Sequence, residues 1–171
     1  MSINKGVHLQ DAPYQLLEYT KMIRQQIHIK NEKYDWKVRI YYIVTDINAE
    51  EIMEQLIALG CSGENLQDAE LNLTKGQMNT GLTYSNAEKK KTVMVIAKTS
   101  TAMEFACSQQ QEVGHLKSHM AEAYGIPQKG EEIQYLGDEI YRKMWPEAKM
   151  LLCDCCRHFM GGEKGDVAIF N

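Results

Sequence analysis

One motif organises the interpretation of this 171-residue chain: Gln111-Glu112-Val113-Gly114-His115-Leu116-Lys117-Ser118-His119. At roughly 100° per residue, Gln111, His115 and His119 fall on one side of a helix, because positions four apart share a face. The apolar residues form a second stripe, which predicts a core-facing flank; they are Val113, Leu116, Met120, Ala123 and Tyr124. Glu112 lies at the border between the two stripes. The pattern predicts an amphipathic helix with imidazole groups beside a buried flank.

The signals at both ends of this helix predict a span from about 102 to 124. Thr101 can act as the N-cap with Glu104 as its capping-box partner, and Gly125 can end the helix. Gly114 costs about 1 kcal/mol relative to Ala in a helix interior. We therefore expect a close neighbour, such as a crossing backbone, beside Gly114.

Strands and one helix are predicted upstream of the motif. Residues 38–44 and 92–99 are rich in β-branched and aromatic side chains, which favours strands. Residues 80–85 form a weaker strand pattern and predict a hairpin with 92–99. A helix capped by Asp46 or Asn48 is expected to follow the first strand and to end at Gly60; its apolar face is Ile52, Leu56 and Leu59.

Other helical patterns complete the expected elements. They are residues 13–27, opened by Pro13; residues 61–73, a short helix that runs into an extended piece; residues 129–141; and a last helix from Pro146 to near Cys156. Residues 1–12 are expected to form a loose N-terminal arm and residues 161–171 a C-terminal tail. Without repeats or linkers, the chain is interpreted as a single domain over 1–171.

The composition argues against two classes of partner. The net charge is −4, so we expect no nucleic-acid partner, and the run Lys89 to Lys91 is expected to protect a strand edge rather than bind phosphate. No apolar stretch approaches the roughly 18 residues that a membrane span needs, so no membrane partner is expected. With no signal-peptide pattern, we expect a cytoplasmic protein.

The cysteines do not follow a disulfide framework. The chain has five, an odd count, and three of them are clustered at Cys153, Cys155 and Cys156, with His158 nearby. This pattern suits a reducing compartment. It does not have the spacing of a standard zinc site, so the cysteines are expected mainly to be free thiols that pack as small hydrophobes, with metal binding a less favoured alternative.

The order of strand, helix, further strands, motif helix and following helix resembles the zincin fold, over roughly residues 34–157. Residues 111–115 differ at one position from the H-E-x-x-H signature of zinc proteases. Downstream, Gly130-Glu131-Glu132-Ile133-Gln134-Tyr135-Leu136-Gly137 is similar to the segment that carries the ligand glutamate in gluzincin-like proteins. The combination looks like the small zincin-like proteins of prophages and mobile elements. The resemblance implies an α+β fold in which a small mixed or antiparallel sheet packs against the motif helix and following helices.

The resemblance also implies roles for individual residues. His115 would be the second zinc ligand, Glu132 the third ligand with Glu131 as the alternate, and Glu112 the general base. Gln111 takes the position of the first ligand, where its neutral amide oxygen is a weaker donor to zinc than an imidazole nitrogen.

Two rebuilt metal sites remain open. His115 and His119 could bind zinc with Glu131 or Glu132, although Glu112 would then not lie between the two histidines. Alternatively, Gln111, His115 and Glu132 could hold a harder divalent ion. Beside these stand simpler interpretations, in which the histidines form a polar helix face and Glu112 is an ion-pair partner of Lys117 or a buried structural carboxylate.

Two functions follow. The favoured prediction is a catalytically silent binding or structural subunit of phage or mobile-element origin, with a protein or peptide partner, because Gln111 replaces a ligand. The alternative is an active metal-dependent peptidase with Glu112 as general base. In the alternative, the strand at 92–99 would hold an extended substrate by edge pairing.

Overall fold

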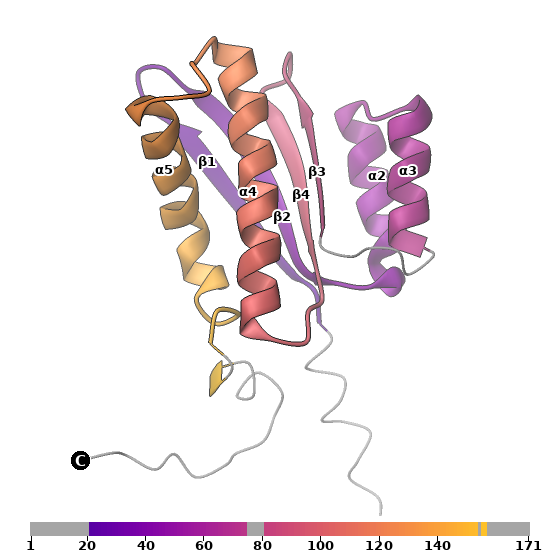
Figure 1. Ribbon diagram of the computed structural model, residues 1–171. Coiled ribbons are helices and arrows are strands. Elements are labelled where there is room, and N and C mark those ends of the chain that lie inside the picture. The colour runs from indigo at the N-terminus through magenta and orange to yellow at the C-terminus, as the bar shows by residue number, and fades with distance from the viewer. Residues whose placement is uncertain (1–20, 75–80, 154, 157–171) are drawn as a thin grey trace, which may run out of the picture.

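The computed structural model describes residues 21–74, 81–153 and 155–156, and within them four strands form one mixed sheet (Figure 1). Their order across the sheet is β1-β2-β4-β3. Strand β1 (Ile23–Lys30) is antiparallel to β2 (Asp35–Val44), and β2 is parallel to β4 (Lys91–Ala97). Strand β3 (Gly81–Asn86) is antiparallel to β4 and forms the edge of the sheet.

Helices cover both faces of this sheet. On one face, α4 (Ala102–Tyr124) packs over β3 and β4, and α5 (Glu131–Ala148) packs over β1. On the other face, α2 (Ala49–Leu59) packs over β4 and β3, with α3 (Gly63–Thr74) beside it. A short 3-10 turn, η1, precedes α2 and spans Asp46–Asn48.

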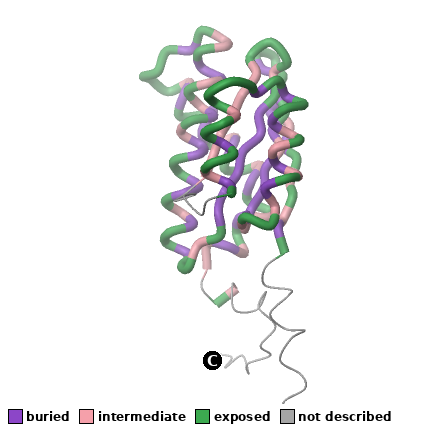
Figure 2. The backbone as a smooth tube through the Cα atoms, turned by 90° about the vertical axis from the view of Figure 1, so that its right-hand side faces the viewer, coloured by how far each residue is buried: buried purple, intermediate pink, exposed green. Residues whose placement is uncertain are grey.

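Alternation along β4 explains the two layers. Met94 and Ile96 belong to the apolar cluster beneath α4 and α5, whereas Val93 and Val95 belong to the cluster beneath α2 and α3. Successive strand residues point to opposite faces, so a strand covered on both sides is apolar throughout. Figure 2 shows the buried backbone running through the middle of the molecule.

The layer of α2 and α3 leaves one part of the sheet uncovered. Strand β1 presents Arg24, Gln26 and Lys30 to solvent on this face, and β2 presents Lys37. The alternate residues Ile27 and Ile29 of β1 point into the cluster beneath α4 and α5. The chain is therefore an α+β protein whose sheet is apolar on one face and partly polar on the other.

Several sequence predictions are confirmed. The motif helix has the predicted span, with the Thr101–Glu104 capping box and a left-handed Gly125 at its C-terminus. The strand predicted at 38–44 and the helix that ends at Gly60 are also present, and β3 forms the predicted hairpin with β4. In the described part of the chain, no helix has the length and apolar character needed to cross a bilayer.

Other predictions are wrong. Residues 23–27 are not helical but belong to β1, because they pair with β2 and alternate between core and solvent; residues 13–20 lie outside the described part. Residues 61–73 are not a helix followed by an extended piece, since α3 is helical to Thr74. The two helices predicted at 129–141 and from Pro146 onward are largely one, since Pro146 lies inside the last turn of α5.

Two further expectations are corrected. A Cβ atom added at Gly114 would have no heavy atom within 4 Å, so no crossing backbone explains this glycine. The strand at 92–99 cannot pair with a substrate through its edge, because β4 lies between β2 and β3. The expected arm (1–12), the expected tail (161–171) and His158 all lie outside the described residues.

Candidate functional site

Glu112 of α4 is buried against the edge strand β3. It is 2% exposed, and its Oε2 atom accepts a hydrogen bond of 2.7 Å from the Thr83 hydroxyl. Gly81 makes this approach possible, because a Cβ atom there would lie 2.9 Å from Glu112 Oε1 and 2.3 Å from the Val95 carbonyl oxygen. Burial raises the pKa of Glu112, and the opposing effects of Thr83 and His115 are smaller. Glu112 therefore occupies the position of a buried structural carboxylate.

His119 ends a chain of hydrogen bonds that starts in the core. The Trp36 indole donates to Thr92 Oγ1 at 2.8 Å, Thr92 Oγ1 lies 2.7 Å from Ser85 Oγ, and Ser85 Oγ lies 2.9 Å from His119 Nδ1. An indole N–H can only donate, so the simplest arrangement has each hydroxyl donating to the next group. Nδ1 of His119 is then an acceptor.

The charge state of His119 agrees with this assignment. Burial lowers the pKa of His119, and the neighbouring His115 adds to the effect. The ring centroids of His115 and His119 are 6.5 Å apart and their planes are inclined by 26°. His115 itself is exposed, as is Gln111. The structure thus brings the two histidines together, one held against β3 and the other turned to solvent.

Glu132, the predicted third ligand, is held elsewhere. It accepts hydrogen bonds from Lys33 Nζ at 2.9 Å and from the Tyr34 hydroxyl at 2.7 Å. The bond from Lys33 and then that from Tyr34 lower the pKa of Glu132, while burial, followed by the bond to Glu132, raises the pKa of Tyr34 to about 12. These partners lie at the connection between β1 and β2. Glu131 is exposed in the first turn of α5.

The donors named by the resemblance do not meet at one point. Glu132 is bonded at the β1–β2 connection, whereas His119 is bonded to β3 at the opposite edge of the sheet. Among the described residues, ligand atoms from three His, Cys, Asp or Glu side chains come together only at Cys153, Cys155 and Cys156. Gln111 adds only an exposed, neutral amide. This donor set does not fit a three-ligand zinc site at the motif helix.

The cysteine cluster differs from its prediction. Cys153 and Cys155 form a disulfide, while Cys61, Cys107 and Cys156 are free. The three clustered sulfur atoms lie within 4.8 Å of one another. The sequence spacing alone predicts free thiols here. Whether Cys153 and Cys155 can pair depends on the local backbone conformation, which the spacing does not contain.

Sequence reasoning did not identify the hydroxyl residues of β3. Thr83 and Ser85 lie two positions apart, so they share one face of the strand, and this face meets α4. The alternation Thr83-Tyr84-Ser85 in a predicted strand is the sequence signal that could have identified this polar face. His119, Thr83 and Ser85 also line a cavity of about 410 Å³ that reaches Asn65 and Asp68 of α3.

Comparison with known proteins gives no relative: no family model, curated protein or solved structure matches this chain.

Proposed function

We propose that the chain is a catalytically silent, zincin-like protein that serves as a binding or structural subunit of a phage or mobile-element assembly. The observation that carries the proposal is the position of Glu112. The residue is 2% exposed and its carboxylate accepts a hydrogen bond from Thr83, which suits a structural role better than the activation of a water molecule. A side chain in the place of a general base therefore holds the edge strand to the motif helix.

The surroundings of the motif support the same proposal. Gln111, the residue in the first-ligand position, is exposed, and Glu132 is bonded to Lys33 and Tyr34. The polar cavity beside His119 lies at the edge of the sheet, where a partner's side chains can enter it. A protein or peptide partner is the class of ligand that this edge suits.

The alternative is a metal-dependent peptidase with a rebuilt site. The nearness of the His115 and His119 rings favours it, since residues four apart on a helix can share one ion. Against it, Nδ1 of His119 is bonded to Ser85, and no acidic side chain of the described residues joins the pair as a third donor.

The test is the metal content of protein purified without chelator, beside a Gln111→His variant. We expect no bound metal in the unaltered protein. About one zinc ion per chain in the variant would identify a zincin frame that has lost a ligand. If neither protein binds metal, the zincin-like part of the proposal is wrong. Zinc in the unaltered protein, with peptide hydrolysis abolished by Glu112→Gln, would overturn the proposal in favour of the peptidase.

A further inference from the structure

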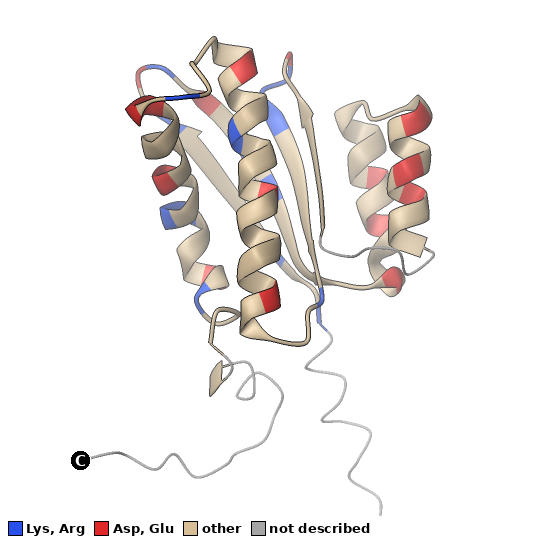
Figure 3. Ribbon diagram, viewed as in Figure 1, with Lys and Arg blue, Asp and Glu red and all other residues tan. Residues whose placement is uncertain are grey.

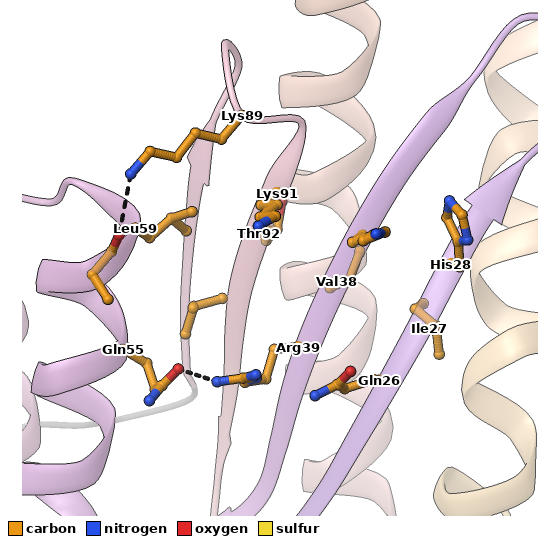
Figure 4. Close-up of a pocket in the computed structure, with 13 residues that line it drawn as sticks. Gln26, Ile27, His28, Val38, Arg39, Gln55, Leu59, Lys89, Lys91 and Thr92 are labelled. Carbon is orange, nitrogen blue, oxygen red and sulfur yellow. Dashed lines mark hydrogen bonds between the residues drawn. The ribbon is translucent and has the colours of Figure 1, made fainter.

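An open groove lies on the sheet face that α2 and α3 leave uncovered. Its floor is formed by β1, β2 and β4, its wall is α2, and its volume is about 670 Å³ (Figure 4). Figure 4 looks onto this face, with α2 at one side and α4 and α5 behind the sheet. Cavities of roughly 300–1,000 Å³ are typical of small-molecule sites.

The charged side chains that line the groove are all basic. Lys37, Arg39, Lys89 and Lys91 line it together with His28, and no Asp or Glu is among the described residues of the lining. Lys37 of β2 lies in register with Lys91 of β4 on one side and with His28 of β1 on the other. Adjacent strands are about 4.8 Å apart, so these side chains lie side by side.

The acidic side chains at the ends of this face are already paired. Glu51 is bonded to Arg24, and Asp35 lies 2.6 Å from His28. In the described part of the chain, no ion pair or side-chain hydrogen bond involves Lys37 or Lys91. The bond to His28 and, to a smaller extent, the charge of Lys37 lower the pKa of Asp35. Like charges directly opposite on neighbouring strands are destabilising. An anion placed between the two lysines would relieve this repulsion.

The remaining lining is suited to the organic part of a ligand. Ala58, Leu59 and Val93 provide apolar surface, and the amides of Gln26 and Gln55 provide donors and acceptors. Arg39 is bonded to Gln55, which fixes its guanidinium at the wall of the groove. A few polar groups in an apolar concavity are typical of a small-ligand site.

A long polyanion fits this groove less well. The chain has a net charge of −4, and residues 49–74 carry six acidic residues and no Lys or Arg: Glu50, Glu51, Glu54, Glu64, Asp68 and Glu70. Figure 3 shows acidic positions in red on both α2 and α3. The lining also contains no Phe, Tyr or Trp on which bases could stack. The basic side chains of the groove therefore lie beside an acidic pair of helices, which does not suit a long polyanion.

We propose that this groove binds a small, multiply phosphorylated organic ligand, with its phosphates between Lys37 and Lys91. Phosphate oxygens bonded by ammonium groups make charge-assisted hydrogen bonds, which are among the strongest in proteins. The proposal concerns the sheet face opposite α4 and does not depend on the role of the motif helix.

Isothermal titration calorimetry with ATP, inorganic triphosphate and adenosine tests the proposal. We expect saturable binding of ATP, weaker binding of triphosphate, and no binding of adenosine. A Lys37→Gln, Lys91→Gln double variant should weaken ATP binding by about tenfold or more, because it removes two charge-assisted contacts. The matched control is a Lys21→Gln, Lys149→Gln double variant, which changes the net charge equally outside the groove and should alter the affinity by less than about twofold.

Each other outcome overturns the proposal. Absence of saturable binding of both ATP and triphosphate by the unaltered protein does so without any variant. Equal weakening by the two double variants would mean attraction to net charge rather than to the groove. Binding of a single-stranded oligonucleotide but not of ATP would assign this face to nucleic acid. Circular dichroism and thermal melting show whether the double variants keep the fold.

Discussion

Substitution of Gly114 by alanine should stabilise the protein. Gly114 lies in the interior of α4, and a Cβ atom there would meet no heavy atom within 4 Å. Glycine is less favourable than alanine in a helix interior by about 0.8–1.0 kcal/mol, because its backbone loses more conformational freedom on folding. With no steric cost to subtract, the whole of this difference should appear as a gain of about 1 kcal/mol in the free energy of unfolding.

Urea denaturation followed by circular dichroism measures this gain. The midpoint should rise with an unchanged m-value, and the melting temperature should increase by about 2–4 °C for a chain of this size. Gly81→Ala serves as the control with the opposite expected result. A Cβ atom at this position would lie 2.3 Å from the Val95 carbonyl oxygen, so the substitution should destabilise the protein. A loss of stability in Gly114→Ala would refute the reasoning, because it would require a close neighbour at this helix face.

Three other substitutions or titrations test the environment of α4. Burial raises the pKa of Glu112, so its contribution to stability is present below the unfolded pKa and is lost as the pH rises through the folded value. Glu112→Gln should therefore gain stability relative to the unaltered protein as the pH rises above about 4.3, by about 1.4 kcal/mol per unit of pKa difference, measured by urea unfolding at a series of pH values. Burial lowers the pKa of His119, so its contribution to stability is present above the unfolded pKa of about 6.5 and is lost as the pH falls through the folded value. NMR titration should place the His119 midpoint below about 6.5, and a midpoint above this value would contradict the buried position beside Ser85. Thr101→Ala should cost about 1 kcal/mol by removing the side-chain cap on the Glu104 amide, and an unchanged urea midpoint would contradict the capping box.

The span of the motif helix could be predicted because its boundaries depend on local signals. The Thr101 capping box and the left-handed Gly125 act within a few residues of the chain, and both are visible in the sequence. Strand β1 could not be predicted in the same way. Ile23 and Ile27 also match a helical spacing, and the choice between helix and strand depends on pairing with β2, a contact that the local pattern does not contain.

The candidate site was predictable to a similar extent. Helical spacing correctly predicted that His115 and His119 are neighbours, since this depends on one element. The partners of Glu132 depend on where α5 meets the β1–β2 connection, about a hundred residues away in the chain. Spacing within one segment contains no information on such a contact. Whether any of these residues binds a metal stays a prediction.

The register between α4 and β3 explains which motif residues remain available. Positions seven apart on a helix differ by only roughly 20° in direction, so Glu112 and His119 point the same way. They meet Thr83 and Ser85, which are two apart and therefore on one face of β3. His115 is rotated by roughly 60° from Glu112 and turns to solvent, as its exposure shows. The helix therefore uses its Glu112–His119 face to hold the edge strand, and a motif of the H-E-x-x-H type would need Glu112 to be free.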